Sequence, residues 1–447
     1  MREKGKMVSA LVLAVLALFG SAHQVAGQDG ISGADTSWLL VSMSLVLLMT
    51  PGLALFYGGL VNARNALNTM MMSFVALGAV GVAWAVAGYS LAFGEGSALA
   101  GDLSMAFLRG VGLDANGSIP HLLFMGFQGT FAIITAALIS GALIGRMRFG
   151  PYVAFIVLWG LAVYAPVAHW VWGGGWLSGM GALDFAGGAV VHVNAGAAAF
   201  AAALVLGKRN TYGREAILPH SVPFVLIGAG LLWFGWFGFN GGSALAADGI
   251  AALASVNTLL APAGTLVVWA LLDHYRSGTV TGVGIATAIV VGLVAVTPAA
   301  GFVSPMSALI IGGVAALPSY FMLQWRPRTA LDDSLDVVAA HGVGGMTGAI
   351  LTGVFADAAV NGSVDGLLTG NPGQLVPQVV SVVAVFAYSA IITLVLLKAI
   401  SVVRPLRPSL KDEGRGMDIV NHGEEAYARG DGALLLLDSE INDNGGA

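Results

Sequence analysis

The sequence contains no cysteine and very little charge. Cysteine is absent from all 447 residues, which excludes disulfide bonds, thiolate metal ligands and cysteine nucleophiles. Charged residues make up only 10% of the chain, against about 25% in soluble globular proteins. The net charge of −5 offers no basic surface for a nucleic-acid partner. These absences argue against a soluble domain and against a nucleic-acid-binding protein.

Apolar and small residues dominate instead. Hydrophobic residues account for 57% of the chain, and its 64 glycines favour close approach between membrane helices. Eleven apolar segments are long enough to cross a bilayer, and no long polar domain separates them. The sequence therefore predicts an all-α polytopic membrane protein with eleven transmembrane helices, at 37–61, 68–93, 121–145, 149–171, 188–207, 221–241, 250–272, 279–298, 303–323, 338–356 and 377–402.

The first 27 residues are typical of a cleaved signal peptide. Arg2, Lys4 and Lys6 precede an apolar core at 7–19, and small residues follow it. The core is shorter than the roughly 20 residues that a membrane span needs, although an uncleaved first span is the alternative. We therefore expect a signal peptide at 1–27, a membrane domain at 28–403 and a C-terminal tail at 404–447.

Basic residues in alternate connections predict the orientation. One set of connections carries nearly all the lysines and arginines, which the positive-inside rule places in the cytoplasm. A cleaved signal peptide followed by eleven spans also puts the C-terminus inside. We expect a multi-pass protein of the cell (inner) membrane with its N-terminus outside, and these basic residues inside: Arg64, Arg146, Arg148, Lys208, Arg209, Arg214, Arg276, Arg326, Arg328 and those of the tail.

The odd number of spans suggests internal symmetry. Spans one to five and six to ten form halves of equal number and opposite orientation, with span eleven left over. This number and orientation of spans indicate a 5+5 inverted repeat plus one extra helix. Similar residues end the first and sixth spans, Phe56-Tyr57-Gly58-Gly59 and Phe239-Asn240-Gly241-Gly242.

A second trace of the repeat places an aspartate eight residues before a histidine in each half. Asp184 precedes His192, and Asp333 precedes His341. An inverted repeat would bring both histidines to the middle of the membrane, where paired imidazoles can line a lumen. In the alternative, each histidine packs against a backbone carbonyl of a neighbouring helix. A metal site is less favoured because no mid-span carboxylate or cysteine supplies further ligands.

The two aspartates are interpreted as structural. A carboxylate at the start of a helix can accept hydrogen bonds from free backbone N–H groups and favours the helix dipole. For Asp184, a direct attraction of cations is the alternative.

Aromatic residues suggest a cation site and a gate. Trp172 is followed by three glycines that let the backbone fold over an opening, and its indole face can hold a cation. Phe127 and Phe131 lie one helical turn apart, and Phe239 lies among glycines, as expected for rings that close a narrow pore. Ordinary packing, or an interfacial aromatic belt, is the alternative for each.

These motifs resemble those of the ammonium transporter family, Amt/Mep/Rh, in its bacterial Amt branch. The resemblance covers about Asp35 to Ala428 and includes the segment from Asp184 to Arg209. Further matching motifs are Phe56-Tyr57-Gly58-Gly59-Leu60, Tyr89 to Gly94, Phe127-Gln128-Gly129, Ala168-His169, Trp172 to Gly175, Gly235 to Asn240, Val296 to Ala299, and Gly416 to Ala428 in the tail.

The resemblance implies a function and roles for particular residues. It implies a homotrimer with one hydrophobic pore per subunit that carries ammonium or ammonia, uses no cofactor or resident metal, and is not an enzyme. Trp172, Phe131 and Ser243 would recruit ammonium, and Phe131 and Phe239 would form the gate. His192 and His341 would line the pore and serve a proton path, with Asp184 and Asp333 in support.

The tail resembles one that docks on the cytoplasmic face and helps to bind a PII-type regulatory protein. A sensor that signals through this tail is an alternative function, and a membrane hydrolase with a His/Asp metal centre is a second. The residues from Arg429 to Ala447 extend beyond the resemblance.

Overall fold

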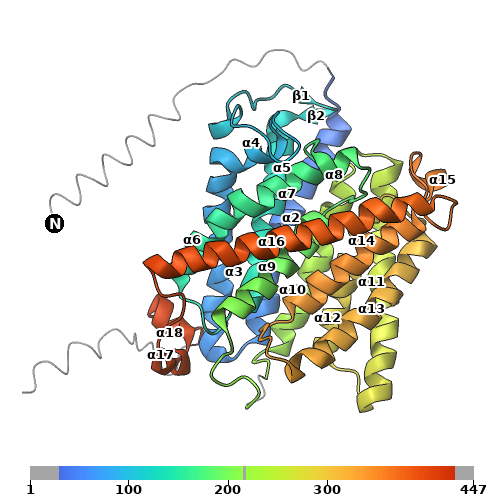
Figure 1. Cartoon of the computed structure of the whole chain (residues 1–447). Helices are drawn as coiled ribbons and strands as arrows, with labels where there is room; N and C mark the ends of the chain where they lie inside the picture. Colours follow the sequence, from blue (N-terminus) through green and yellow to red (C-terminus); the bar gives the residue numbers. More distant parts are fainter. Residues whose placement is uncertain (1–29, 215–217, 428–447) are drawn as a thin grey trace, which may run out of the picture.

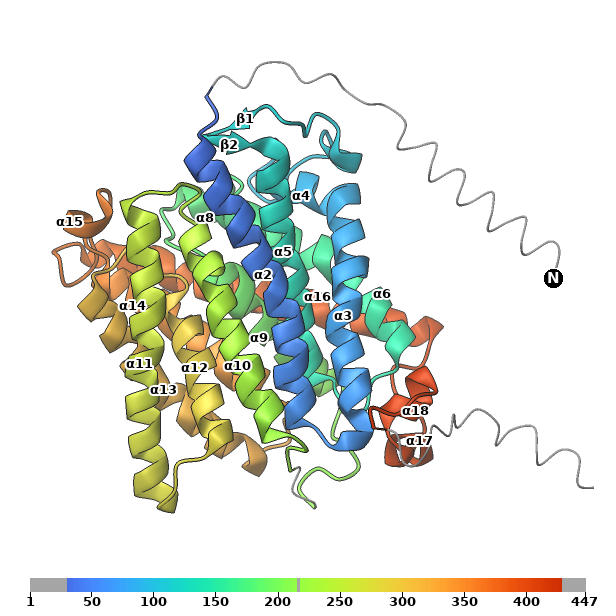
Figure 2. The same ribbon diagram turned by 180° about the vertical axis from the view of Figure 1, so that it is seen from behind.

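The protein is described by a computed structural model that covers residues 30–214 and 218–427 (Figures 1 and 2). The predicted signal peptide at 1–27 and the extension from Arg429 onward lie outside the described residues. The α-helices are α2 (Gly33–Leu60), α3 (Ala66–Ala83), α4 (Tyr89–Phe93), α5 (His121–Ile139), α6 (Phe149–Trp159), α7 (Ala165–Val171), α8 (Trp176–Gly179), α9 (Asn194–Leu206), α10 (Val222–Trp236), α11 (Gly249–Ser277), α12 (Gly282–Val296), α13 (Pro305–Trp325), α14 (Gly344–Phe355), α15 (Ala358–Asn361), α16 (Leu375–Val403), α17 (Leu410–Arg415) and α18 (Met417–His422).

Several spans are interrupted by a π-helical turn, in which the backbone hydrogen bonds skip one extra residue. A two-stranded antiparallel hairpin, β1 (Ala115–Asn116) and β2 (Ile119–Pro120), lies in the connection before α5. The π-helical turns are Trp84–Gly88, Gly160–Tyr164, Gly188–Val193, Phe237–Gly241 and Val338–Val343.

The helices confirm an all-α polytopic membrane protein. Within the described residues, ten helical segments are long and apolar enough to cross a membrane. A shorter apolar helix, α12, occupies the position of the eighth predicted span. Every predicted segment therefore corresponds to an apolar helix, although α12 falls below the length of the other ten.

The packing of the helices follows the pattern that an inverted repeat requires. Helices at equivalent places in the two halves should meet at the symmetry axis. The first span, α2, packs along the sixth, α10 (Figure 2). The fifth span, α9, contacts the π-helical turn that begins the tenth span. Helix α16 belongs to neither half and crosses one face of the bundle obliquely, against α9 and α14 (Figure 1).

The described part of the tail packs on one end of the bundle (Figure 1). The Asp418 carboxylate accepts hydrogen bonds from the backbone N–H groups of Leu67 and Asn68, at 3.1 and 2.7 Å. These groups begin α3, which has no capping side chain of its own. Asn421 similarly accepts a bond from the N–H of Phe149, the first residue of α6. The tail therefore completes the ends of two membrane helices.

Candidate functional site

The first element of the site is Asp184, whose carboxylate binds the backbone at the start of the fifth span. It accepts hydrogen bonds from four consecutive backbone N–H groups at 2.5 to 3.0 Å, those of Gly187, Gly188, Ala189 and Val190. Gly187 has a φ of 116°, a left-handed conformation that glycine adopts without strain. This turn lets the chain wrap around the carboxylate. The arrangement is that of a helix N-cap with an anionic acceptor.

Both histidines lie on π-helical turns rather than on regular helix. His192 belongs to the turn Gly188–Val193, and His341 belongs to Val338–Val343. A π-helical turn displaces side chains from the regular register and is common at functional sites. Phe239 also lies on such a turn, Phe237–Gly241. Three candidate pore residues therefore share one unusual backbone feature.

Glycines allow the two histidine-bearing segments to come close. A Cβ at Gly196 would lie 2.3 Å from the Cα of Gly342, so any larger residue would force the segments apart. A Cβ at Gly345 would lie 3.0 Å from the Cβ of His192. The small residues after each histidine in the sequence are thus the contact surface between the fifth and tenth spans.

The imidazoles of His192 and His341 face each other in this contact. Their Nδ1 atoms lie 3.2 Å apart, and the two rings are close to parallel. Both side chains are buried, and Nε2 of His192 has no hydrogen-bond partner among the described residues. The predicted alternative, a bond from each ring to a backbone carbonyl, is not what the structure contains. The histidines bond to each other across the two halves.

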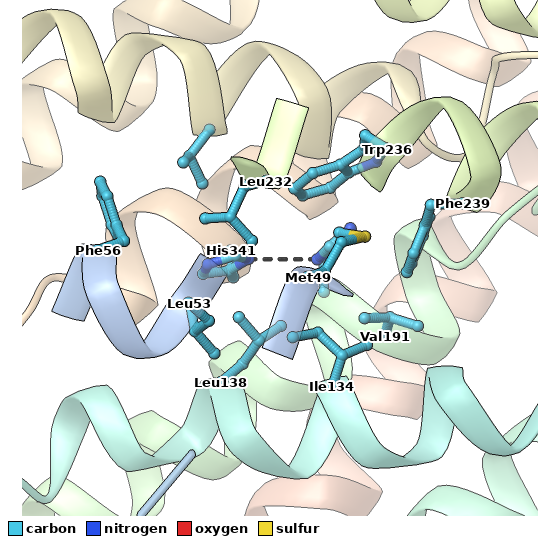
Figure 3. Close-up of a pocket in the computed structure, with 12 residues that line it drawn as sticks. Met49, Leu53, Phe56, Ile134, Leu138, Val191, Leu232, Trp236, Phe239 and His341 are labelled. Carbon is cyan, nitrogen blue, oxygen red and sulfur yellow. Dashed lines mark hydrogen bonds between the residues drawn. The ribbon is translucent and has the colours of Figure 1, made fainter. Parts of the chain in front are cut away.

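The pair lies in a narrow apolar cavity (Figure 3). The remaining lining side chains are hydrocarbon, thioether or aromatic, and the indole N–H of Trp236 is already donated to Thr297. The histidine rings are therefore the polar groups that this cavity can offer a solute. Its lining consists of Met49, Leu53, Phe56, Ile134, Leu138, Val191, His192, Leu232, Trp236, Phe239, Val290 and His341.

A row of rings leads from the histidines toward one end of the bundle. His192 stacks with Phe239 at a centroid distance of 6.0 Å, and Phe239 stacks with Phe131 at 4.2 Å. Phe131 meets the edge of Trp172 at 6.1 Å. Phe131 and Phe239 are fully buried and fill the space between Trp172 and the cavity. The structure brings together the aromatic residues that were selected from the sequence.

Trp172 and Ser243 are each fixed by a backbone acceptor. The Trp172 indole N–H donates to the carbonyl of Asp184 at 2.9 Å, which ties the indole to the start of the fifth span. The Ser243 hydroxyl donates to the carbonyl of Phe239 at 2.8 Å. A hydroxyl oxygen that donates in this way still has lone pairs for another donor. Ser243 can therefore accept a hydrogen bond from a small cation.

At the opposite end of the bundle, Asp333 belongs to a cluster of buried charges. Its carboxylate accepts one bond, from the N–H of Val338 at 2.7 Å. The adjacent Asp332 forms an ion pair with Arg209, with the shortest contact at 2.6 Å, and its carboxylate lies 3.9 Å from the guanidinium of Arg146. Burial opposes ionisation of Asp332, but the bonds from Arg209 and the charges of both arginines lower its pKa. Burial also lowers the pKa of Arg146, to about 10.

Sequence reasoning missed this cluster and the π-helical turns. Arg146 and Arg209 were used only as indicators of orientation, yet Arg146 is completely buried and donates to Ser334 and to the carbonyl of Asp332. One signal was present, since two adjacent aspartates precede the second histidine. The π-helical turns have no comparable sequence signal.

Comparisons with known proteins agree with this geometry. Residues 37–427 match the family described as the Ammonium Transporter Family. An ammonium transporter of Aquifex aeolicus is 46% identical over 418 residues, which span 92% of this chain and 97% of that protein. An ammonium transporter of Bacillus subtilis is 45% identical over 398 residues, 88% of this chain and 98% of that protein.

A solved structure shares the fold. The crystal structure of Candida albicans Mep2 superposes with a TM-score of 0.82 at 37% identity and covers 88% of this chain and 90% of that one.

Proposed function

The chain belongs to the ammonium transporter family, and we propose that it moves ammonium by separating ammonia from its proton inside the pore. Its relatives support transport across a membrane as the function. The finer mechanism is inferred from the cavity. Moving a bare cation into apolar surroundings without compensation costs tens of kcal/mol in the Born limit. Neutral ammonia avoids most of this cost, so a narrow apolar lumen favours it.

The single observation that carries the proposal is the Nδ1–Nδ1 contact of His192 and His341, at 3.2 Å in an apolar cavity. Only one of two neutral imidazoles can donate in such a bond. The donor ring then has a bare Nε2, and the acceptor ring has a protonated Nε2. The pair thus offers the lumen one acceptor and one donor, and these roles exchange when the shared proton crosses to the other ring while the bare Nε2 gains a proton and the protonated Nε2 releases one. This arrangement suits both hydrogen bonding to ammonia and proton relay.

Recruitment and gating are assigned to the row of rings. Trp172 and Phe131 offer aromatic faces to a cation, and Ser243 offers a hydroxyl acceptor. Phe131 and Phe239, stacked at 4.2 Å, separate this outer position from the histidines. A rotation of these rings would open the way for a molecule as small as ammonia. Asp184 supports the outer position indirectly, through its cap and the Trp172 bond to its carbonyl.

We further propose that the end bearing α17 and α18 faces the cytoplasm, in the inner membrane of the cell. The basic residues Arg64, Arg148 and Arg209 all lie at this end, as their bonds to or near the tail indicate. The family resemblance supports assembly as a homotrimer and binding of a PII-type protein on this face. The basic residues and short apolar core within 1–27 support removal of this segment as a signal peptide.

The test is to record ammonium-evoked current and ammonium uptake on the same proteoliposomes. His192→Ala and His341→Ala are each expected to lose most of the current, because the proton path is broken. Leu53→Ala is the matched control, since it enlarges the same cavity without touching an imidazole. Unaltered current and unaltered exclusion of potassium in both histidine variants would contradict the proposal.

A further inference from the structure

A third histidine, His169, lies outside the pore and has an unusual pair of partners. It belongs to α7, near the outer end of the fourth span, and its side chain is only 3% exposed. Its Nδ1 lies 3.0 Å from the carbonyl oxygen of Ala92, and its Nε2 lies 2.8 Å from that of Ser97. Both ring nitrogens therefore face an oxygen of the same kind.

Carbonyl oxygens accept hydrogen bonds and cannot donate them. Both nitrogens must carry hydrogen for both contacts to be bonds, and only the imidazolium form does so. A neutral ring would direct one nitrogen lone pair at a carbonyl oxygen at about 3 Å and would lose that bond. Bonds from a charged donor are also roughly twice as strong as neutral ones. The geometry thus selects the charged ring.

The same segment binds the outer connection at two further points. The Trp170 indole donates to the carbonyl of Leu99, and the Trp176 N–H donates to that of Ala98. Carbonyls from three consecutive residues, 97–99, are thereby turned toward α7 and α8. His169 contributes one of these bonds, to Ser97, and its other contact is with the carbonyl of Ala92 in α4.

The three glycines after Trp172 make this contact possible. A Cβ at Gly173 would lie 2.0 Å from the carbonyl oxygen of Ala92 and 2.8 Å from Nδ1 of His169. A Cβ at Gly175 would lie 2.9 Å from the carbonyl oxygen of Ala98. The sequence interpretation had these glycines folding the backbone over an opening. Gly173 and Gly175 instead admit the carbonyls that His169 and its neighbours bind.

Few charged groups face His169 from the surrounding elements. The connection 94–102 carries Glu95 and Asp102, both exposed, and Asp102 bonds to Ser104. From α16, Tyr388 packs against Trp170 of this segment and donates to the carbonyl of Ala162. No carboxylate forms an ion pair with His169 within the residues described. Backbone carbonyls alone therefore compensate the imidazolium charge.

His169 is closely linked to the proposed recruitment site. Trp172 follows it by three residues, at the end of α7, and its N–H donates to the carbonyl of Ala168. The Trp172 indole is held at its other end by Asp184. A change in the packing of α7 against the connection 94–101 would therefore move the backbone of Trp172, while its indole N–H stays bound to the carbonyl of Asp184.

We propose that His169 is an imidazolium that holds both the end of α4 and the connection 94–101 against α7, and thereby positions Trp172 for ammonium. This inference rests on the proposed function only for the role of Trp172. Loss of either of the two His169 bonds loosens this contact and weakens recruitment. His169 touches no substrate and acts only through the position of Trp172.

The protonation state is tested directly by nitrogen NMR. Full-length protein labelled with ¹⁵N-histidine is placed in lipid nanodiscs, and the His169 signals are assigned with His169→Gln. Two protonated ring nitrogens are expected at neutral pH. One bare ring nitrogen at neutral pH would overturn the proposal whatever the transport data show.

Uptake of methylammonium, which stays protonated over a wide pH range, tests the positioning role. His169→Gln keeps one donor and should raise KM about tenfold at neutral pH, the equivalent of one such bond, with little change in maximal rate. Leu99→Ala is the control, because it keeps the carbonyl that Trp170 binds and should leave KM unchanged.

Two results would overturn the positioning role. One is a fall in maximal rate without a change in KM, and the other is a KM and a maximal rate that are both unchanged in His169→Gln. Trp172→Leu separates the two proposals. If it leaves KM unchanged, recruitment by Trp172 fails, whereas the NMR result still decides the charge on His169.

Discussion

The two halves of the molecule repeat one unit, an aspartate eight residues before a pore histidine, but they build it differently. Asp184 accepts four backbone N–H groups from its own segment. Asp333 accepts one, and its Oδ1 has no partner among the described side chains and backbone. We call the segment of Asp184 and His192 the outer unit and that of Asp333 and His341 the inner unit, following the proposed orientation. The carboxylate of the outer unit is satisfied within its own segment, whereas that of the inner unit depends on neighbouring segments.

The neighbours of the inner unit come from distant parts of the chain. Arg146 follows α5, and Arg209 follows α9, yet both reach Asp332. Glu413 of the tail accepts a bond from the N–H of Asn210, next to Arg209. The tail therefore contacts the connection that carries Arg209, which in turn binds Asp332 beside the inner unit. Equivalent sequence positions can thus differ in whether the rest of the chain influences them.

The largest expected effect comes from removing the outer cap. Asp184→Ala leaves four buried N–H groups without an acceptor, and bonds to a charged acceptor contribute about 1.5 kcal/mol or more each. The variant should lose about 6 kcal/mol of stability and all uptake, measured by tryptophan-fluorescence thermal unfolding and proteoliposome assay. Asp184→Asn keeps the shape and should be intermediate. An Asp184→Ala protein as stable as the parent would refute the cap.

A smaller loss is expected from the charge cluster of the inner unit. Asp332→Asn leaves the completely buried Arg146 without its carboxylate, which should cost about 3 kcal/mol. The matched control is Asp336→Asn, because its pair with Arg326 has side chains 22% and 13% exposed and should therefore contribute less than a pair that is completely buried. Equal losses in the two variants would show that burial does not distinguish these pairs.

The inner cap itself should matter less than the outer one. Asp333→Ala removes a single backbone bond, and the loss of an N-cap typically costs about 1–2 kcal/mol. Thermal unfolding should rank Asp333→Ala well below Asp184→Ala in its effect. The reverse order would contradict the view that the outer unit is stabilised by bonds within its own segment and the inner unit by contacts with neighbouring segments.

The smallest effect concerns the tail at acidic pH. Burial lowers the pKa of His422 below its ordinary value of 6.5, and its Nε2 contacts the Asn68 side chain. A lowered folded-state pKa means that the docked tail binds protons less readily than the free tail. Docking should be complete above pH 6.5 and should weaken as pH falls below it.

A spin label on a single cysteine in the tail reports this docking, because the chain has no cysteine of its own. The label, at Lys411→Cys, should become more mobile on acidification, and His422→Gln should reduce the change. A label that stays equally immobile at pH 5 and pH 8 would show that His422 does not control docking.

Much of the fold could be predicted because it depends on local pattern. The eleven apolar segments all became helices, and the regular spacing of Asp184 and His192, repeated in the second half, indicated which spans meet. Stacking of Phe131 on Phe239 could only be suspected, since it depends on the register between two spans far apart in sequence. The π-helical turns could not be predicted, because they arise from packing rather than from residue preference.

The charge cluster and the tail contacts were also beyond sequence reasoning. Arg146, in a short connection between spans, looked like a solvated cytoplasmic residue. Arg146 is buried because it pairs with Asp332, which belongs to the other half of the molecule. Asp418 likewise gave no sign that it would cap α3 from more than 300 residues away.

The central claim is that His192 and His341 act as one unit across the two halves. The most direct measurement compares ammonium-evoked current in His192→Asn, His341→Asn and the double variant, each at equal protein density in proteoliposomes. If the rings share one proton path, the double variant should be no worse than the more damaged single variant, because residues that act as a unit are not additive. Current losses that multiply in the double variant would contradict the account.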